Sequence, residues 1–83
     1  MIEEVWNEAR KDEDFVKEVI EKIKTLEVIS WETFHVDTTT FAGYLDVAYE
    51  DGDDKLFVYP CFFGSTLTDQ MPLIFNNKTF ERI

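Results

Sequence analysis

The chain is poor in the residues that build disulfides, metal sites and membrane spans. It has one cysteine, Cys61, and one histidine, His35, among 83 residues. A single cysteine cannot form an internal disulfide, and one cysteine with one histidine cannot fill a tetrahedral zinc site. No run of about 18 apolar residues is present, so we expect no membrane-spanning helix. The composition therefore predicts a protein without a metal or another cofactor.

Basic residues and glycines are also scarce. Eight Lys and Arg face 18 Asp and Glu, which gives a net charge of −10. Such a chain repels phosphate, which argues against direct binding to nucleic acid or to an anionic membrane. Three isolated glycines form no glycine-rich phosphate loop. Residues 1–4 are acidic where a secretory signal would be basic, so we expect a cytoplasmic protein, or one in the host-cell cytoplasm if a phage encodes it.

The residues for catalysis are too few to indicate an enzyme. Nucleophilic catalysis needs a cysteine or serine beside a base. His35 and Cys61 fall on different predicted strands, and nothing in the local sequence joins them. We therefore expect a protein that binds and does not catalyse.

Apolar spacing divides the chain into a helical front, residues 1–27, and a strand-rich remainder, residues 28–83. Helical spacing predicts helices over residues 2–10 and 13–26 with Asp12 as the N-cap between them, or one continuous helix bent near Asp12. Alternation of branched and aromatic residues predicts strands over 28–36, 41–49 and 55–63, with a tight turn at 50–54. Pro60 indicates an edge position or a bulge, because proline cannot donate to a ladder. Residues 64–71 read as a polar loop, and 72–75 with 78–83 as a last hairpin.

These elements predict one domain, residues 1–83, of the α+β class. One or two N-terminal helices would pack on an antiparallel sheet of about four to five strands. The length of 83 residues suits a single small core.

The acidic charge is concentrated behind the helices. Residues 1–24 hold eight acids and five bases, many spaced to pair along a helix, whereas residues 25–77 hold nine acids and a single base, Lys55. Carboxylates on one strand face recur about every 6.7 Å, and one strand of duplex DNA carries a phosphate about every 3.4 Å.

The pattern favours an inhibitor that mimics nucleic acid and blocks a basic nucleic-acid-binding protein. Phages and mobile elements use such proteins against restriction, CRISPR or DNA-repair enzymes. The predicted contact residues are Asp46, Glu50, Asp51, Asp53 and Asp54, followed by Glu32 and Asp37.

Aromatic residues give an alternative basis for binding. Residues 57–63 contain four aromatic side chains, and a sheet packed on one side only leaves rings exposed on the other. Tyr44 and Tyr59 are expected to lie exposed beside the acids, since interface cores favour tyrosine, tryptophan and phenylalanine. The alternative function is an acidic protein-binding module, such as an immunity protein or an antitoxin that masks a basic toxin. A phenylalanine-rich core and a solvated acidic surface without a partner are the simpler interpretations of the same residues.

Overall fold

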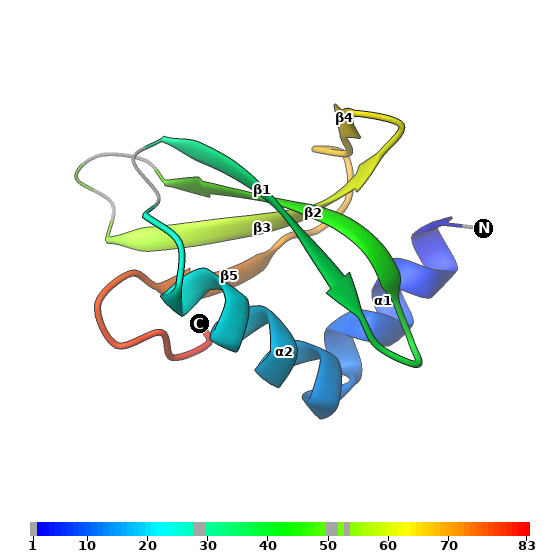
Figure 1. Ribbon diagram of the computed structural model, residues 1–83, viewed down its shortest axis with the longest axis horizontal. Coiled ribbons are helices and arrows are strands. Elements are labelled where there is room, and N and C mark those ends of the chain that lie inside the picture. The colour runs from blue at the N-terminus through cyan, green and yellow to red at the C-terminus, as the bar shows by residue number, and fades with distance from the viewer. Residues whose placement is uncertain (1, 28–29, 50–51, 53) are drawn as a thin grey trace.

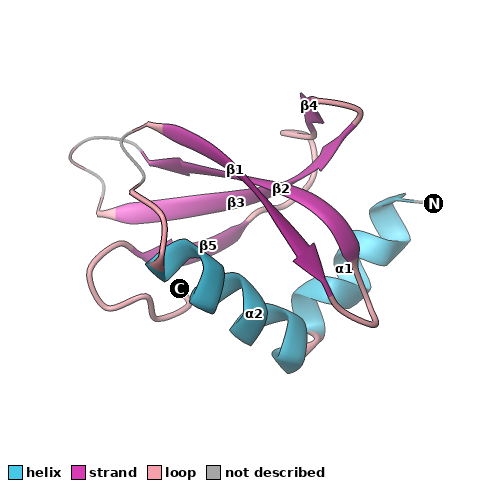
Figure 2. Cartoon of the chain, in the orientation of Figure 1, coloured by secondary structure: helices cyan, strands magenta, loops and turns pink. Residues whose placement is uncertain are grey.

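The computed structural model describes residues 2–27, 30–49, 52 and 54–83. Its elements are helices α1 (Ile2–Lys11) and α2 (Glu13–Lys24) and strands β1 (Trp31–Asp37), β2 (Ala42–Tyr49), β3 (Lys55–Phe62), β4 (Ser65–Thr66) and β5 (Leu73–Asn76). Both helices lie on the same side of the sheet (Figure 1). Figure 2 shows the two layers by element type, with the strands antiparallel throughout. The predicted α+β fold with N-terminal helices on an antiparallel sheet is confirmed.

Asp12 divides the helical front into two helices. Its backbone is extended, with φ −84° and ψ 113°, and its side chain accepts a hydrogen bond from the Asp14 N–H at 3.0 Å. This is the N-cap geometry that satisfies a free N–H at the start of α2. The hydroxyl of Thr40 donates to the other carboxylate oxygen at 2.8 Å. Asp12 therefore begins α2 and also ties it to the loop between β1 and β2.

Strand β3 is the centre of the sheet. β1, β2 and β3 pair in sequence order. The other edge of β3 is shared by β5, which begins with Leu73 opposite Val58, and β4, which ends with Thr66 opposite Cys61. Pro60 lies between these two partners, and its carbonyl accepts from the Leu67 N–H at 2.9 Å. In an antiparallel strand, the N and C=O of one residue point toward the same neighbouring strand. The Pro60 nitrogen therefore points to the space between β4 and β5, where no strand residue requires a hydrogen bond from it. A local gap thus accommodates Pro60 inside a strand that is paired on both sides.

The C-terminal third differs from the sequence prediction in two places. Ser65–Thr66 form β4 within the predicted polar loop, and the expected last hairpin is reduced to one bridge between Phe75 and Arg82. β5 pairs with β3 instead, burying Leu73 and Phe75. After β5, the Asn76 side chain accepts the backbone N–H groups of residues 78 and 79 at 2.8 and 2.9 Å. These bonds close a turn, and the chain returns beside β5 only at residues 81–83.

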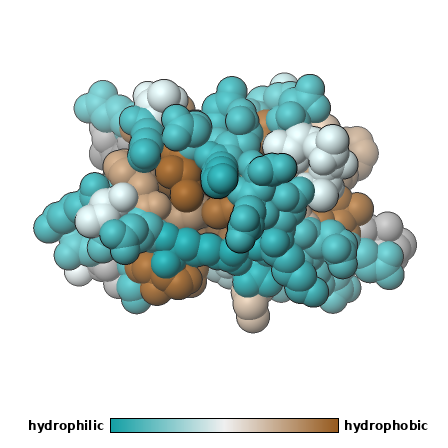
Figure 3. Space-filling model, turned by 90° about the horizontal axis from the view of Figure 1, so that it is seen from below, coloured by the Kyte–Doolittle hydropathy of each residue, from teal (hydrophilic) through white to brown (hydrophobic). Residues whose placement is uncertain are grey.

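The core lies between the helices and the inner face of the sheet. Trp6, Phe15 and Phe41 meet there with ring centroids 5.5–6.0 Å apart, and the Trp6 indole N–H donates to the Met71 carbonyl at 2.7 Å. Alternate strand residues such as Leu45 complete this core. Seen from below Figure 1, the surface over α2 is mostly hydrophilic, as expected for amphipathic helices (Figure 3). Within the described ranges, neither helix is long and apolar enough to cross a membrane.

The opposite face of the sheet, called the outer face below, has no helix over it among the described residues. Because side chains alternate along a strand, every residue next to a core position turns to this face. The outer face carries Trp31, Thr33, His35 and Asp37 from β1, Tyr44 and Asp46 from β2, and Lys55, Phe57, Tyr59 and Cys61 from β3.

Candidate binding site on the outer face of the sheet

Strand register determines which outer-face side chains become neighbours. Thr33 lies opposite Asp46, and His35 lies opposite Tyr44. On the other side of β2, Tyr44 lies opposite Cys61 and Asp46 opposite Tyr59. The middle of the outer face is therefore a group of polar side chains with aromatic rings around it.

Asp46 is the buried charge at the centre of this group. It is 2% exposed, and it is the only charged residue buried among those the structure describes. The hydroxyl of Thr33 donates to one carboxylate oxygen and the hydroxyl of Thr66 to the other. Thr66 belongs to β4, the strand that the sequence prediction did not include. Sequence reasoning placed Asp46 in an exposed acidic row, but its carboxylate is held inside the sheet surface instead.

The other predicted acidic contacts do not gather around Asp46. Asp54 is exposed just before β3, and its carboxylate lies 3.9 Å from the Lys78 ammonium. Asp37 and Glu32 are exposed on β1, and Asp37 lies at the far end of this strand, about 20 Å from its start at about 3.3 Å per residue. The described acids are thus spread over the sheet. Glu50, Asp51 and Asp53 lie outside the described residues.

Little positive charge lies on the outer face. Lys55 is the only Lys or Arg in the strands, while the helices and the C-terminal segment contain the other seven. Tertiary structure brings Arg82 to the same surface pocket as Lys11 and Lys17, beside α1 and α2. Most of the bases therefore lie on the helices and the C-terminal segment, where acids accompany them.

Three exposed aromatic residues line a pocket over Asp46. Trp31 is 45% exposed, Tyr44 is 57% exposed, and Phe63 is fully exposed. The pocket has a volume of about 310 Å³. Its lining comprises Trp31, Thr33, Tyr44, Asp46, Cys61, Phe63, Gly64 and Thr66. The predicted exposure of Tyr44 agrees with the structure, whereas Tyr59 is half-buried and does not line the pocket. The alternation of residues 31, 33 and 35 is the sequence signal that could have added Trp31.

The turn that carries Phe63 has an unusual backbone for its sequence. Phe63 and Gly64 form a two-residue loop between the paired residues Phe62 and Ser65, with φ values of 51° and 77°. Positive φ at both central positions is the requirement of a type I′ turn, which favours Asn-Gly. Phenylalanine is disfavoured there, and Phe63 gains no burial in return. A strained, fully exposed aromatic side chain indicates a role outside the isolated fold.

Cys61 and His35 do not form a nucleophile and base. Burial raises the pKa of the Cys61 thiol, and the nearby Asp46 carboxylate raises it further. A reactive cysteine needs the opposite shift, toward the thiolate. Tyr44 lies between the two residues in the register, and its ring meets that of His35 at 5.1 Å. Within the described ranges, no three His, Cys, Asp or Glu residues are grouped as metal ligands.

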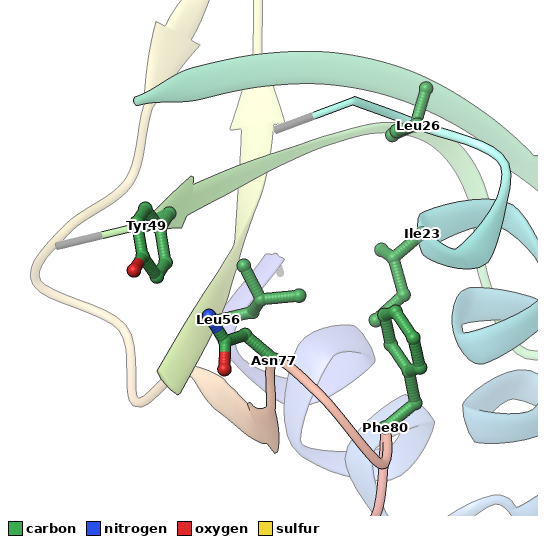
Figure 4. A pocket seen from close by; sticks show the side chains of 6 residues that line it. All are labelled: Ile23, Leu26, Tyr49, Leu56, Asn77 and Phe80. Carbon is green, nitrogen blue, oxygen red and sulfur yellow. The ribbon is translucent and has the colours of Figure 1, made fainter. Parts of the chain in front are cut away.

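A second pocket lies at the opposite side of the sheet, where the end of α2 meets the C-terminal segment. Figure 4 shows its lining by Ile23, Leu26, Tyr49, Leu56, Asn77 and Phe80. Its volume is about 160 Å³, and Tyr49 and Asn77 are the two lining residues with a polar side-chain group. The buried Asn77 Oδ1 has no hydrogen-bond partner among the described residues. Even a bound water needs about two to four polar partners. Two polar side chains are too few to define a site for a larger polar ligand in this pocket.

No protein-family model matches the chain, and the searches of curated proteins and of solved structures also found no match.

Proposed function

We propose that this protein is an acidic protein-binding module that uses the outer face of its sheet to bind a basic partner. The observation that carries the proposal is Phe63, which is fully exposed in a turn conformation that disfavours it. Trp31 and Tyr44 extend the same aromatic surface across β1 and β2. Buried aromatic anchors dominate the binding energy of many protein interfaces.

Charge supports a basic partner over a second copy of this chain. Two copies would each bring a net charge of −10, and like charges across an interface oppose association. Residues 25–77 hold nine acids and one lysine, whereas residues 1–24 hold eight acids and five bases, so a positively charged partner would be steered toward the strand-rich part of the chain. An immunity protein or an antitoxin that masks a basic toxin belongs to this class.

Affinity capture from a bacterial lysate with paired variants tests the proposal. The wild type is compared with Phe63→Asn, and with Met71→Ser as the control, because Met71 is 64% exposed and does not line the pocket over Asp46. We expect a protein retained by the wild type and the control and lost from Phe63→Asn. Equal retention by all three, or no protein retained selectively by the wild type, would refute the proposal.

A nucleic-acid mimic is a second, narrower candidate for the same partner class. It is favoured by the nine acids and one lysine of residues 25–77. A mimic must exclude DNA or RNA from its partner, whereas a plain module need not. Changing Asp51, Asp53 and Asp54 together to Asn should then weaken capture and flatten its dependence on salt. If the partner is still captured in excess DNA and by this triple variant, the nucleic-acid mimic is refuted and the protein-binding module remains.

A further inference from the structure

The pocket over Asp46 combines a buried carboxylate with aromatic walls. Asp46 lies in the middle of β2, and the hydroxyls of Thr33 and Thr66 each donate to one of its oxygens. The Cys61 thiol also hydrogen-bonds to Asp46. A carboxylate has about four lone-pair sites, so at least one acceptor site remains beyond these three bonds. The volume of about 310 Å³ is at the lower end of ligand-pocket sizes, which suits one side chain better than a large ligand.

Asp46 has no cationic partner within the described part of the chain. The ion pairs there join Lys22 to Glu18 and Lys78 to Asp54, and neither involves Asp46. Removing a carboxylate from water is costly, and hydroxyl donors offset only part of that cost. An incoming cation would supply the missing opposite charge. The carboxylate and the acidic net charge both exclude an anionic ligand.

The walls of the pocket favour one kind of cation. The faces of Trp31, Tyr44 and Phe63 can attract a positive charge through their ring quadrupoles. A guanidinium is planar, stacks on aromatic rings, is weakly hydrated and donates two parallel hydrogen bonds to a carboxylate. An ammonium is a compact and strongly hydrated charge, which fits such a pocket less well.

We infer that this pocket binds an arginine side chain of the partner protein, with Asp46 accepting from the guanidinium and the aromatic rings enclosing it. This inference rests on the proposed function for the source of the arginine. It specifies arginine as the residue that the basic partner inserts into the pocket.

Titration with small arginine compounds tests the pocket without the partner. The probe is N-acetyl-arginine amide, followed by NMR through the Trp31 indole N–H and the backbone amides of Thr33, Asp46 and Thr66. We expect saturable shifts at these groups. N-acetyl-citrulline amide, which has the same shape without the charge, should cause none. N-acetyl-lysine amide should bind several-fold more weakly.

Two variants separate a specific pocket from general attraction to an acidic protein. Asp46→Asn keeps the shape and can still hydrogen-bond to the two threonines, and it should weaken arginine binding at least tenfold. Phe63→Asn should weaken it several-fold, while Met71→Ser should leave it unchanged. Equal shifts with citrulline, undiminished binding by Asp46→Asn, or shifts centred on the helices would overturn the inference.

The same variants distinguish failure of this inference from failure of the proposed function. If Phe63→Asn loses the captured partner while arginine does not bind the pocket, the module stands and the arginine inference fails. If arginine binds in an Asp46-dependent manner but Phe63→Asn still captures the partner, the pocket stands and the proposed interface fails.

Discussion

Replacing Phe63 by asparagine should stabilise the isolated protein. Phe63 has φ 51° in a turn whose first central position favours asparagine, and its side chain is fully exposed. The left-handed conformation costs about 1–2 kcal/mol for most L-residues, and asparagine recovers much of this through local hydrogen bonds. Because the Phe63 ring buries almost no surface, little apolar burial is lost. The expected gain in the free energy of unfolding is about 1 kcal/mol.

A gain of that size is measurable in a domain of 83 residues. At about 4–8 °C per kcal/mol for domains of this size, the melting temperature should rise by about 4–8 °C. Thermal unfolding followed by circular dichroism, with urea unfolding as a second measurement, tests this. An unchanged or lower melting temperature would show that Phe63 makes stabilising contacts in the free protein, and the inference of a binding role from strain would fail.

Phe80 is the matched control for this prediction. It also has a positive φ, 60°, but it is half-buried and packs against the core. Burying a phenylalanine side chain fully contributes about 1.5–3 kcal/mol, and the cavity left by its removal adds to the loss. In Phe80→Asn the lost packing should exceed the backbone gain, so the variant should be less stable by about 1 kcal/mol or more. Opposite signs for the two variants would separate backbone strain from side-chain burial.

Two further predictions concern titratable groups. The hydrogen bond from Thr40 lowers the pKa of Asp12, so its stabilising effect is present above the unfolded value of about 3.9 and is lost as the pH falls through the folded pKa. The difference in the free energy of unfolding between wild type and Asp12→Asn, measured by urea unfolding, should therefore decrease below about pH 4. A difference that stays constant with pH would contradict this. Because burial and the neighbouring Asp46 raise the pKa of Cys61, its alkylation by iodoacetamide at pH 8 should be slower than that of a free thiol and faster in Asp46→Asn; equal rates in the two proteins would refute the role of Asp46.

Most of the fold was predictable because local patterns agree with the tertiary structure. The helices were expected over 2–10 and 13–26 and are observed over 2–11 and 13–24, since Asp12 is a good cap and the apolar arc continues on both sides of it. The three long strands follow from alternation. The two errors near the C-terminus have a common cause, because a two-residue strand and a single bridge are too short to show an alternating pattern in the sequence.

The candidate site was less predictable. Acidic residues were easy to count, but the count did not distinguish Asp46, which is buried, from Asp37 and Asp54, which are exposed. Burial of Asp46 requires Thr66 on β4, and a local sequence pattern does not show that contact. Of the two predicted aromatic contacts, Tyr44 lines the pocket and Tyr59 does not. Trp31 and Phe63 also line it, and the sequence did not predict them as contacts.

The sequence by itself determined the acidic charge, the two helices and the long strands, because composition and periodicity are properties of nearby residues. Only the tertiary structure decided that Asp46 becomes a buried acceptor between two hydroxyls and that Phe63 remains exposed beside it. The register of β1, β2 and β3 decides which side chains become neighbours of Asp46, and a local pattern in one strand does not specify which residue of another strand it will face. The β3–β4 turn then brings Thr66 and Phe63 to the same place.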